Sequence, residues 1–187
     1  MKCSKIYFLV VFTLLNCYSN AQMNWIDFEN NGEGEQPPQL SLLNDSTIRV
    51  DFFGTNHFKK NINDTIYDVL RLSGKNGRTV DIGLPELPTK SCFVEIVVDT
   101  PNISIISEEY IIIENIYVTP AQEYYDTIET VQELPFEKND SLYNTNDFYP
   151  GGNVMIGMPG TIRDHKISSL VFYPIQFNPV TKHLTLL

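Results

Sequence analysis

The sequence is poor in basic residues and in histidines, and each scarcity excludes a class of function. Only 13 lysines and arginines stand against 23 aspartates and glutamates in 187 residues, so the formal net charge is −10. A surface this acidic disfavours nucleic acid as a partner. The three histidines, His57, His165 and His183, lie singly, whereas histidine metal ligands usually come in closely spaced pairs. The sequence therefore predicts no metal site and no bound cofactor.

Cysteines are equally scarce, because only Cys92 lies beyond residue 21. A single cysteine cannot form an internal disulfide, so the fold must depend on a hydrophobic core. Cys92 begins a strongly apolar segment, where a thiol usually packs as a small hydrophobic group. The sequence also has no serine nucleophile elbow and no glycine-rich phosphate loop. We predict no catalytic residue in this chain.

Long apolar runs are absent except at the N-terminus, where Ile6–Leu15 follow two lysines and precede small residues ending at Ala21. Because this run is too short to span a bilayer, residues 1–21 are predicted to be a secretory signal peptide, and no membrane span is expected. A lipoprotein signal at Cys17 is the alternative. Cleavage after Ala21 removes two lysines and no acids, which leaves a net charge of −12. We expect export to the periplasm, the extracellular space or the cell surface.

What the sequence does contain is short segments of alternating polarity. Ile48, Val50 and Phe52 fall on one face of a predicted strand, with Arg49 and Asp51 on the other. Similar β-branched or aromatic segments occupy residues 65–72, 78–82, 92–99, 103–106, 110–118, 153–158, 161–163, 167–173 and 182–187. Eleven prolines exclude long helices, since proline removes an amide donor and clashes with the preceding turn.

The pattern predicts an all-β fold over residues 45–187. We expect an antiparallel, jelly-roll-like β-sandwich of two sheets and about eight to ten short strands, without substantial helix; a closed barrel is the alternative. Residues 22–44, rich in glycine, proline and asparagine, predict a flexible leader. The turn at Gly74–Gly77 predicts a β-hairpin over residues 65–82. The long polar segment 121–148 predicts a loop that contacts a partner.

Acidic residues recur without the spacing of a calcium-binding loop, at Asp45, Asp51, Asp64, Asp68 and Asp81. We interpret them as a solvated surface. No local feature of the sequence calls for a pair of catalytic carboxylates, so intrinsic hydrolase activity is the weakest functional hypothesis.

Three ordered pieces of the sequence combine prolines with apolar, strand-like residues: Gly83–Pro88 with Phe93–Val98, then Ile116–Gln122, then Phe148–Pro150 with Gly160–Lys166 and Leu170–Lys182. The third piece, which contains the run YPIQFNPVT, is the most specific. Together they resemble the propeptide domain of gingipain-type cysteine peptidases, the C25 peptidase family, over roughly residues 48–187.

This resemblance implies a β-sandwich prodomain that keeps a following caspase-like cysteine peptidase domain latent and helps it to fold until proteolysis releases it. It also implies a loop that offers a basic residue to the specificity pocket of the peptidase. Lys138 is the only basic residue between Lys90 and Arg163, and it lies in the long irregular segment beside Phe136 and Glu137. We expect Lys138 and its two neighbours to form the inhibitory loop, with Lys90 and Arg163 as alternatives.

The other residues of the resemblance are expected to be scaffold, because proline fixes φ where strands end. They are Gly83, Pro85, Pro88, Pro120, Pro150, Arg163, Pro174, Asn178 and Pro179. Asn178 and Pro179 should form a turn that returns residues 182–187 to the sheet as a final strand.

Two arrangements fit a sequence that holds no peptidase domain. We expect either a fragment of a longer precursor, ending at its last strand, or an orphan prodomain that acts in trans. The expected partner in both is a cysteine peptidase domain, and the domain itself is expected to be monomeric. The alternative function is a free-standing secreted adhesion or glycan-binding module, suggested by ten tyrosines and eleven phenylalanines. Most of these aromatics occupy alternating strand positions, which favours a role in the core.

Overall fold

The computed structural model describes residues 23–28, 32, 34–96, 103–105, 110–123 and 135–186. The predicted signal peptide lies outside the described residues, as do parts of the strands expected over 92–99 and 103–106 and part of the irregular segment 121–148.

Thirteen strands and one short helix form within the described residues. The strands are β1 (Asn24–Asp27), β2 (Gln39–Asn44), β3 (Thr47–Asp51), β4 (Gly54–Ile62), β5 (Thr65–Arg71), β6 (Gly77–Arg78), β7 (Pro88–Glu95), β8 (Ile111–Ile113), β9 (Val154–Ile156), β10 (Gly160–Ile162), β11 (His165–Phe172), β12 (Ile175–Asn178) and β13 (His183–Leu186). Helix α1 (Asp140–Tyr143) has only four residues. All pairs of these strands are antiparallel, so the predicted all-β antiparallel fold without substantial helix is confirmed.

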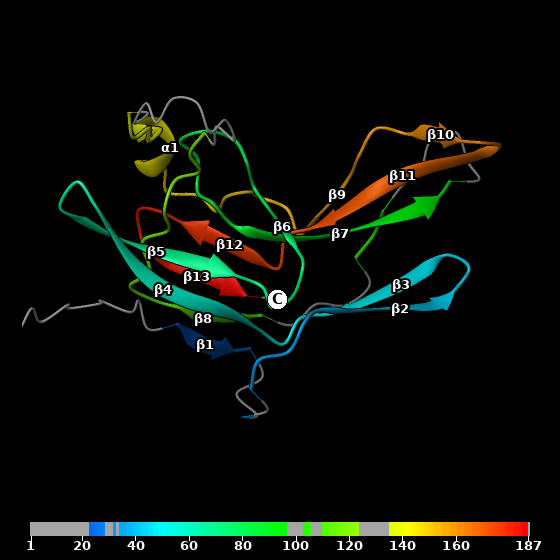
Figure 1. Ribbon diagram of the computed structural model, residues 1–187, viewed down its shortest axis with the longest axis horizontal. Coiled ribbons are helices and arrows are strands. Elements are labelled where there is room, and N and C mark those ends of the chain that lie inside the picture. The colour runs from blue at the N-terminus through cyan, green and yellow to red at the C-terminus, as the bar shows by residue number, and fades with distance from the viewer. Residues whose placement is uncertain are drawn as a thin grey trace, which may run out of the picture.

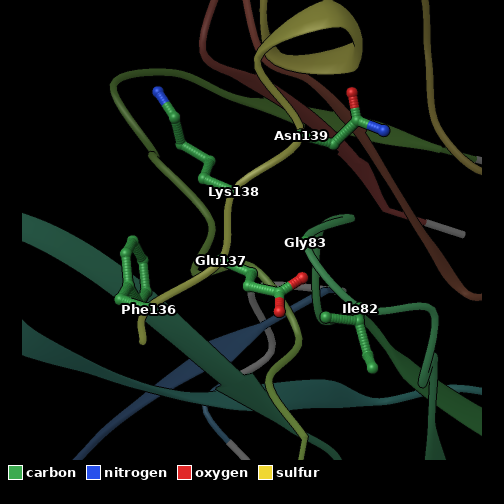
Figure 2. Close-up of a pocket in the computed structure, with 6 residues that line it drawn as sticks. All are labelled: Ile82, Gly83, Phe136, Glu137, Lys138 and Asn139. Atoms are coloured by element: carbon green, nitrogen blue, oxygen red, sulfur yellow. The ribbon is translucent and has the colours of Figure 1, made fainter. Parts of the chain in front are cut away.

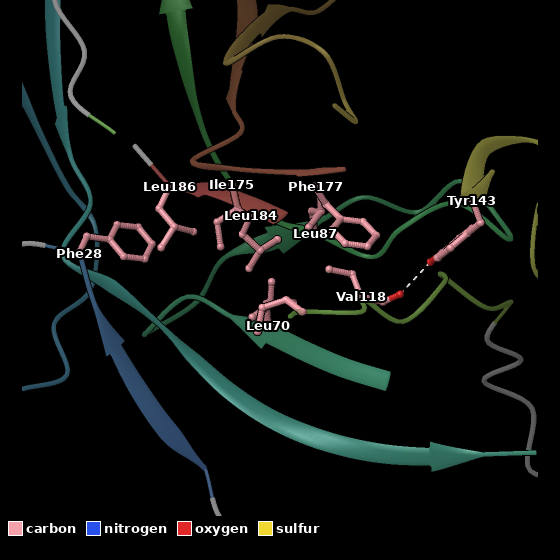
Figure 3. Packing of buried hydrophobic residues seen from close by; sticks show 10 residues of the cluster. Phe28, Leu70, Leu87, Val118, Tyr143, Ile175, Phe177, Leu184 and Leu186 are labelled. Carbon is pink, nitrogen blue, oxygen red and sulfur yellow. Dashed lines mark hydrogen bonds between the residues drawn. The ribbon is translucent and has the colours of Figure 1, made fainter. Parts of the chain in front are cut away.

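The strands are divided among four sheets, where two were expected. The strand orders are β1-β4-β5, β12-β13-β8, β2-β3, and β10-β11-β7-β6 with β9 also paired to β11. The first two sheets enclose the main hydrophobic core between them, which is the arrangement of a sandwich (Figure 3). Leu70 of β5, Phe177 of β12 and Leu184 of β13 are completely buried in this core. We call these two sheets, with residues 116–121 and α1, the packed lobe.

Residues 116–121 enter the core between the two sheets without forming a long strand. Val118 is completely buried, and it forms an isolated parallel bridge with Asp68 of β5. The Asp68 N–H donates to the Tyr117 carbonyl over 2.7 Å, and the Thr119 N–H donates to the Asp68 carbonyl over 3.0 Å. These bonds satisfy the backbone of a buried segment that has no full strand partner.

The predicted leader over residues 22–44 contains two strands, which corrects that prediction. β1 pairs with β4, and Phe28 directly after it lies in the core. Gly54 makes this pairing possible, because a Cβ there would lie 2.4 Å from the Trp25 ring. A strand of four residues is too short to show a periodicity in sequence, so only its tertiary contacts reveal it.

The hairpin predicted over residues 65–82 is wrong. β5 pairs with β4 through a two-residue turn at Asn63 and Asp64, whereas β6 pairs with β7. Both turn residues have positive φ, 49° and 61°, which a tight hairpin requires and which asparagine and aspartate tolerate. The glycines at 74 and 77 therefore serve a connection between two sheets and not a hairpin tip.

The sheet that contains β7, β9, β10 and β11 extends away from the packed lobe (Figure 1). We call Ser91–Glu95 of β7, together with β9, β10 and β11, the arm. Its two long strands pair from Ile167 opposite Glu95 to Phe172 opposite Lys90. The described part of the chain contains no helix long and apolar enough to cross a membrane.

Candidate functional site

The described part of the predicted inhibitory loop lies on a cluster of stacked tyrosines. Tyr67 and Tyr117 stack with ring centroids 5.1 Å apart, and Tyr143 meets Tyr117 edge-on at 5.6 Å. We call these three rings the tyrosine cluster. Phe136 packs on the Tyr67 ring with a centroid distance of 5.6 Å. It therefore fixes the start of residues 136–139, which we call the Lys138 segment, to the packed lobe.

Lys138 also lies against this cluster. Its Nζ is 5.5 Å from the Tyr143 ring centroid and 2.8 Å from Oδ1 of Asp140. The hydrogen bond to Asp140 raises the pKa of Lys138, with partial burial opposing it, so the ammonium stays protonated at neutral pH. Because 30% of the side chain is exposed, the charge is accessible to a partner.

The side chains of the segment alternate in direction. Figure 2 shows Phe136 and Lys138 on one side of the segment, and Glu137 and Asn139 on the other. Alternation with a period of two is typical of an extended backbone. The segment, together with Ile82 and Gly83, borders a hollow of about 390 Å³.

Two contacts anchor the backbone of the segment. The side-chain amide of Gln122 bonds to both the N–H and the carbonyl of Glu137, over 2.9 and 2.7 Å. The Asn139 N–H donates to the Gly83 carbonyl over 3.0 Å. Gly83 has φ +79°, and a Cβ there would lie 3.0 Å from the Asn139 nitrogen, so both its conformation and this close approach favour glycine.

Helix α1 fixes the other end of the segment. The Asn139 side chain caps the helix by accepting from the Leu142 N–H over 3.1 Å, and Asp140 lies in the first turn, where the helix dipole favours a negative charge. The Tyr143 hydroxyl donates to the Val118 carbonyl over 2.8 Å, and burial raises the pKa of Tyr143. The backbone is thus fixed on both sides of Lys138, at Glu137 by Gln122 and at Asn139 by the helix cap.

The two alternative basic residues lie in different surroundings. Lys90 lies within β7, opposite Phe172, and is half-buried in the sheet. Arg163 is exposed in the two-residue turn between β10 and β11, with φ +55°. Neither side chain lies on an unpaired extended segment. Lys90 is in a strand that is paired with β11, and Arg163 is in a left-handed turn.

The residues predicted to be scaffold mostly lie inside. Pro85, Pro88, Pro120 and Pro174 have almost no exposed surface, and Pro85 and Pro120 form an isolated bridge. Pro88 begins β7, Pro174 lies between β11 and β12, and Pro150 follows a cis peptide bond. Asn178 Oδ1 accepts from the N–H groups of Val180 and Thr181, both over 3.1 Å, in the turn that leads past Pro179 to β13. The predicted return of the chain as a final strand is confirmed over 183–186.

The prediction of a solvated acidic surface is wrong for Asp68. Its side chain is only 5% exposed, its Oδ1 lies 2.6 Å from Nε2 of His57, and its Oδ2 accepts from the Tyr117 N–H over 2.7 Å. A buried carboxylate needs such partners. Asp68 therefore ties β4 and β5 to the tyrosine cluster, a role that local sequence does not signal.

The structure offers neither a cluster of metal-ligating side chains among the described residues nor an activated thiol at Cys92. Within the described residues, no group of three or more His, Cys, Asp or Glu side chains could hold a metal ion. Cys92 is half-buried, and burial raises the pKa of its thiol, with Lys90 opposing the shift. A protonated thiol is a poor nucleophile.

Sequence reasoning missed Gln122 and Asp140, the residues that hold the segment. In the sequence, Gln122 stands only at the end of the piece Ile116–Gln122, and Asp140 lies within the polar segment 121–148. The signal available for Asp140 was its place after Asn139, since Asn-Asp is a common start for a helix. No local signal pairs Gln122 with Glu137, because 15 residues separate them.

The fold and the site define an all-β domain that presents one lysine on an anchored surface segment. The model of the Propeptide_C25 family matches residues 30–187. The chain belongs to this family, and it is a propeptide domain rather than a catalytic domain. The predicted family resemblance is confirmed.

Individual relatives agree with this family. Gingipain R1 of Porphyromonas gingivalis is 31% identical over 104 residues, which are 54% of this chain and 10% of the relative. Gingipain R2 of the same species is 28% identical over 82 residues, which are 44% of this chain and 11% of the relative. The chain therefore spans about a tenth of the length of the curated relatives it matches.

Two solved structures share the fold. A structure described as giving insight into the zymogenic latency of gingipain K from Porphyromonas gingivalis has a TM-score of 0.70 and 18% identity, over 88% of this chain and 93% of that chain. A complex of Porphyromonas gingivalis RgpB pro- and mature domains has a TM-score of 0.69 and 20% identity, over 82% of this chain and 81% of that chain.

Proposed function

We propose that this chain is the prodomain of a secreted gingipain-like cysteine endopeptidase, where it inhibits the caspase-like catalytic domain and assists its folding. Membership of the Propeptide_C25 family supports this, as do the two solved structures, one concerned with zymogenic latency and one with a complex of pro- and mature domains. The partner is then a cysteine peptidase domain, in cis or in trans.

Lys138 is the residue that we assign to the specificity pocket of the peptidase, with Phe136 and Glu137 as its flanks. The observation that carries this assignment is the anchored, extended segment on which Lys138 lies. An extended segment can enter a cleft by pairing its main chain with the walls. Because the segment is already ordered, binding costs little conformational entropy.

The ion pair between Lys138 and Asp140 does not prevent such insertion. Asp140 is 75% exposed, so the pair is worth at most about 1 kcal/mol. An acidic group in the peptidase pocket can replace Asp140 as the partner of the ammonium. The pair keeps Lys138 on the surface until the peptidase binds.

An inhibition assay tests the assignment. The purified domain is titrated into the C25 peptidase domain of the same genome, with a small lysine or arginine substrate. Wild type should inhibit at micromolar concentration or below, and Lys138→Ala should weaken inhibition at least about 30-fold, as for an interface hot spot. Lys75→Ala, which removes the same charge from an exposed turn, is the control.

Each outcome of this assay has a separate meaning. Full peptidase activity at micromolar wild-type domain would rule out the inhibitory function. Equal inhibition by wild type and Lys138→Ala would rule out only Lys138, and Arg163→Ala and Lys90→Ala then test the alternatives.

Export and the relation to the peptidase have their own tests. If residues 1–21 are a signal peptide, the N-terminus of the exported protein is Gln22, which mass spectrometry of the exported protein determines. The reading frame beyond codon 187 distinguishes action in cis from action in trans. A continuation into a caspase-like domain with a His and Cys pair supports the first, and a stop codon supports the second.

A further inference from the structure

We propose that Gln122 is a positioning residue, which holds the Lys138 segment in one extended conformation and so sets the geometry in which Lys138 is presented. The consequence for inhibition rests on the proposed function, whereas the effect on the segment itself belongs to the domain alone.

The first argument is the geometry of the amide. Nε2 of Gln122 donates to the Glu137 carbonyl over 2.7 Å, and Oε1 accepts from the Glu137 N–H over 2.9 Å. One side chain thus bonds to both main-chain groups of one residue, as a neighbouring β-strand does. The two bonds also define the orientation of the amide, because only Nε2 can donate.

Gln122 itself has a rigid base. Its Nε2 lies 3.0 Å from the Ala121 carbonyl and 3.2 Å from that of Pro120, so the side chain folds back over its own backbone. The Ala121 N–H donates to the Leu84 carbonyl over 2.7 Å, and the Ala121 carbonyl accepts from the Gly83 N–H over 2.8 Å. The Gln122 amide is therefore fixed to the packed lobe independently of its bonds to Glu137.

The two hydrogen bonds between Gln122 and Glu137, which we call the clamp, leave the opposite edge of the segment available. Glu137 and Asn139 direct their N–H groups to Gln122 and Gly83, on the side of the domain. In an extended chain the main-chain groups of alternate residues point to opposite sides. Among the residues that the structure describes, the main-chain N–H and carbonyl of Lys138 make no hydrogen bond. They suit an extended edge in the peptidase cleft, which would pair with them as an added strand.

The chemistry of the clamp requires an amide of this length. A glutamate at 122 could still accept from the Glu137 N–H, but its carboxylate could not donate and would face the Glu137 carbonyl. An asparagine is shorter by one methylene and could not reach Glu137 from the same backbone position. Gln122→Glu therefore loses one of the two bonds and adds a negative charge, whereas Gln122→Asn loses both bonds without a change of charge.

Amide hydrogen exchange of the purified domain tests the clamp without a peptidase. In Gln122→Asn, whose side chain is too short to reach Glu137, the Glu137 amide should exchange at least about tenfold faster than in wild type, as expected for the loss of a hydrogen bond. Gln39→Glu is the matched control, because Gln39 is an exposed glutamine in β2. Unchanged exchange at Glu137 in Gln122→Asn would overturn the proposal.

Inhibition of the same peptidase tests the consequence. Gln122→Glu and Gln122→Asn should each inhibit about tenfold less well than wild type, while Gln39→Glu inhibits as wild type and the thermal midpoint of Gln122→Asn stays within about 2 °C of wild type. If wild type does not inhibit, the proposed function fails and the exchange result still decides the clamp. If wild type inhibits and both Gln122 variants match it, Gln122 does not position Lys138.

Discussion

The packed lobe and the arm are built from the same kind of strand but bury very different amounts of side chain. In the lobe, Leu70, Val118 and Phe177 are completely buried between two sheets. In the arm, the face that carries Phe93 and Met155 is open, with these side chains 77% and 51% exposed. The lobe is therefore held by its core, and the arm mainly by strand pairing.

This difference bears on where an inhibitory segment can work. A site is precise when its supporting residues are themselves locked by packing and hydrogen bonds. The Lys138 segment lies on the lobe, where Tyr143 and Gln122 connect it to buried backbone. Arg163 lies at a turn of the arm, which offers no comparable support.

The largest expected effect compares the two regions directly. Phe177→Ala should lower the free energy of unfolding by about 3–5 kcal/mol, because it leaves a cavity in the core. Phe93→Ala should change it by less than about 0.5 kcal/mol, since that ring is mostly exposed. Urea unfolding monitored by the fluorescence of Trp25 measures both. Similar losses in the two variants would mean that the arm is as tightly packed as the lobe.

A smaller effect is expected at the contact between the lobe and the segment. Gly83→Ala should cost about 1–2 kcal/mol, because alanine is strained at φ +79° and its Cβ crowds the Asn139 nitrogen. Gly152→Ala is the control, since a Cβ there meets nothing within 4 Å and φ is not positive. Thermal unfolding of both variants checks this. Equal midpoints would show that Gly83 does not hold the segment.

The smallest expected effect is a loss of stability of the lobe in alkali. Burial, with the charge of Asp81 as the second cause, raises the pKa of Tyr149 to about 12, and burial also raises the pKa of Tyr143. Above pH 10 the unfolded chain loses protons that the folded chain keeps, so the free energy of unfolding falls as pH rises from about 10 towards 12. Since Tyr149 is partly solvated, we expect about 1 kcal/mol from it.

Thermal midpoints between pH 8 and pH 11 measure this dependence. Tyr149→Phe should flatten the decline, whereas Tyr110→Phe, at an exposed position, should leave it unchanged. A decline that is equally steep in wild type and in Tyr149→Phe would contradict the assignment.

Local sequence was sufficient where a pattern extended over several residues. The alternation at residues 48–52 predicted β3, and the apolar run from Cys92 predicted the second half of β7. The turn at Asn178 predicted the return to β13, because its side-chain acceptor acts on the next few residues. Each of these signals is local, although β7 pairs with the distant strand β11.

Local sequence failed where a strand was short or a partner distant. β1 is four residues long and depends on Gly54, 27 positions after the residue that pairs with it. The turn at Gly74–Gly77 resembled a hairpin tip, but β5 pairs with β4 because a second, tighter turn at Asn63 and Asp64 precedes it. Pairing depends on the competition between turns, which neither turn reveals alone.

The sequence by itself determined the all-β class, the family and the single lysine of the irregular segment, because composition, turn residues and ordered motifs are properties of the chain. Only the tertiary structure decided which strands pair, that Asp68 is buried beside His57, and that Gln122 and Gly83 hold the backbone around Lys138. The physical reason is distance along the chain. The contacts of Asp68, Gln122 and Gly83 join groups 11 or more residues apart, and their hydrogen bonds exist only once folding has brought the segments together.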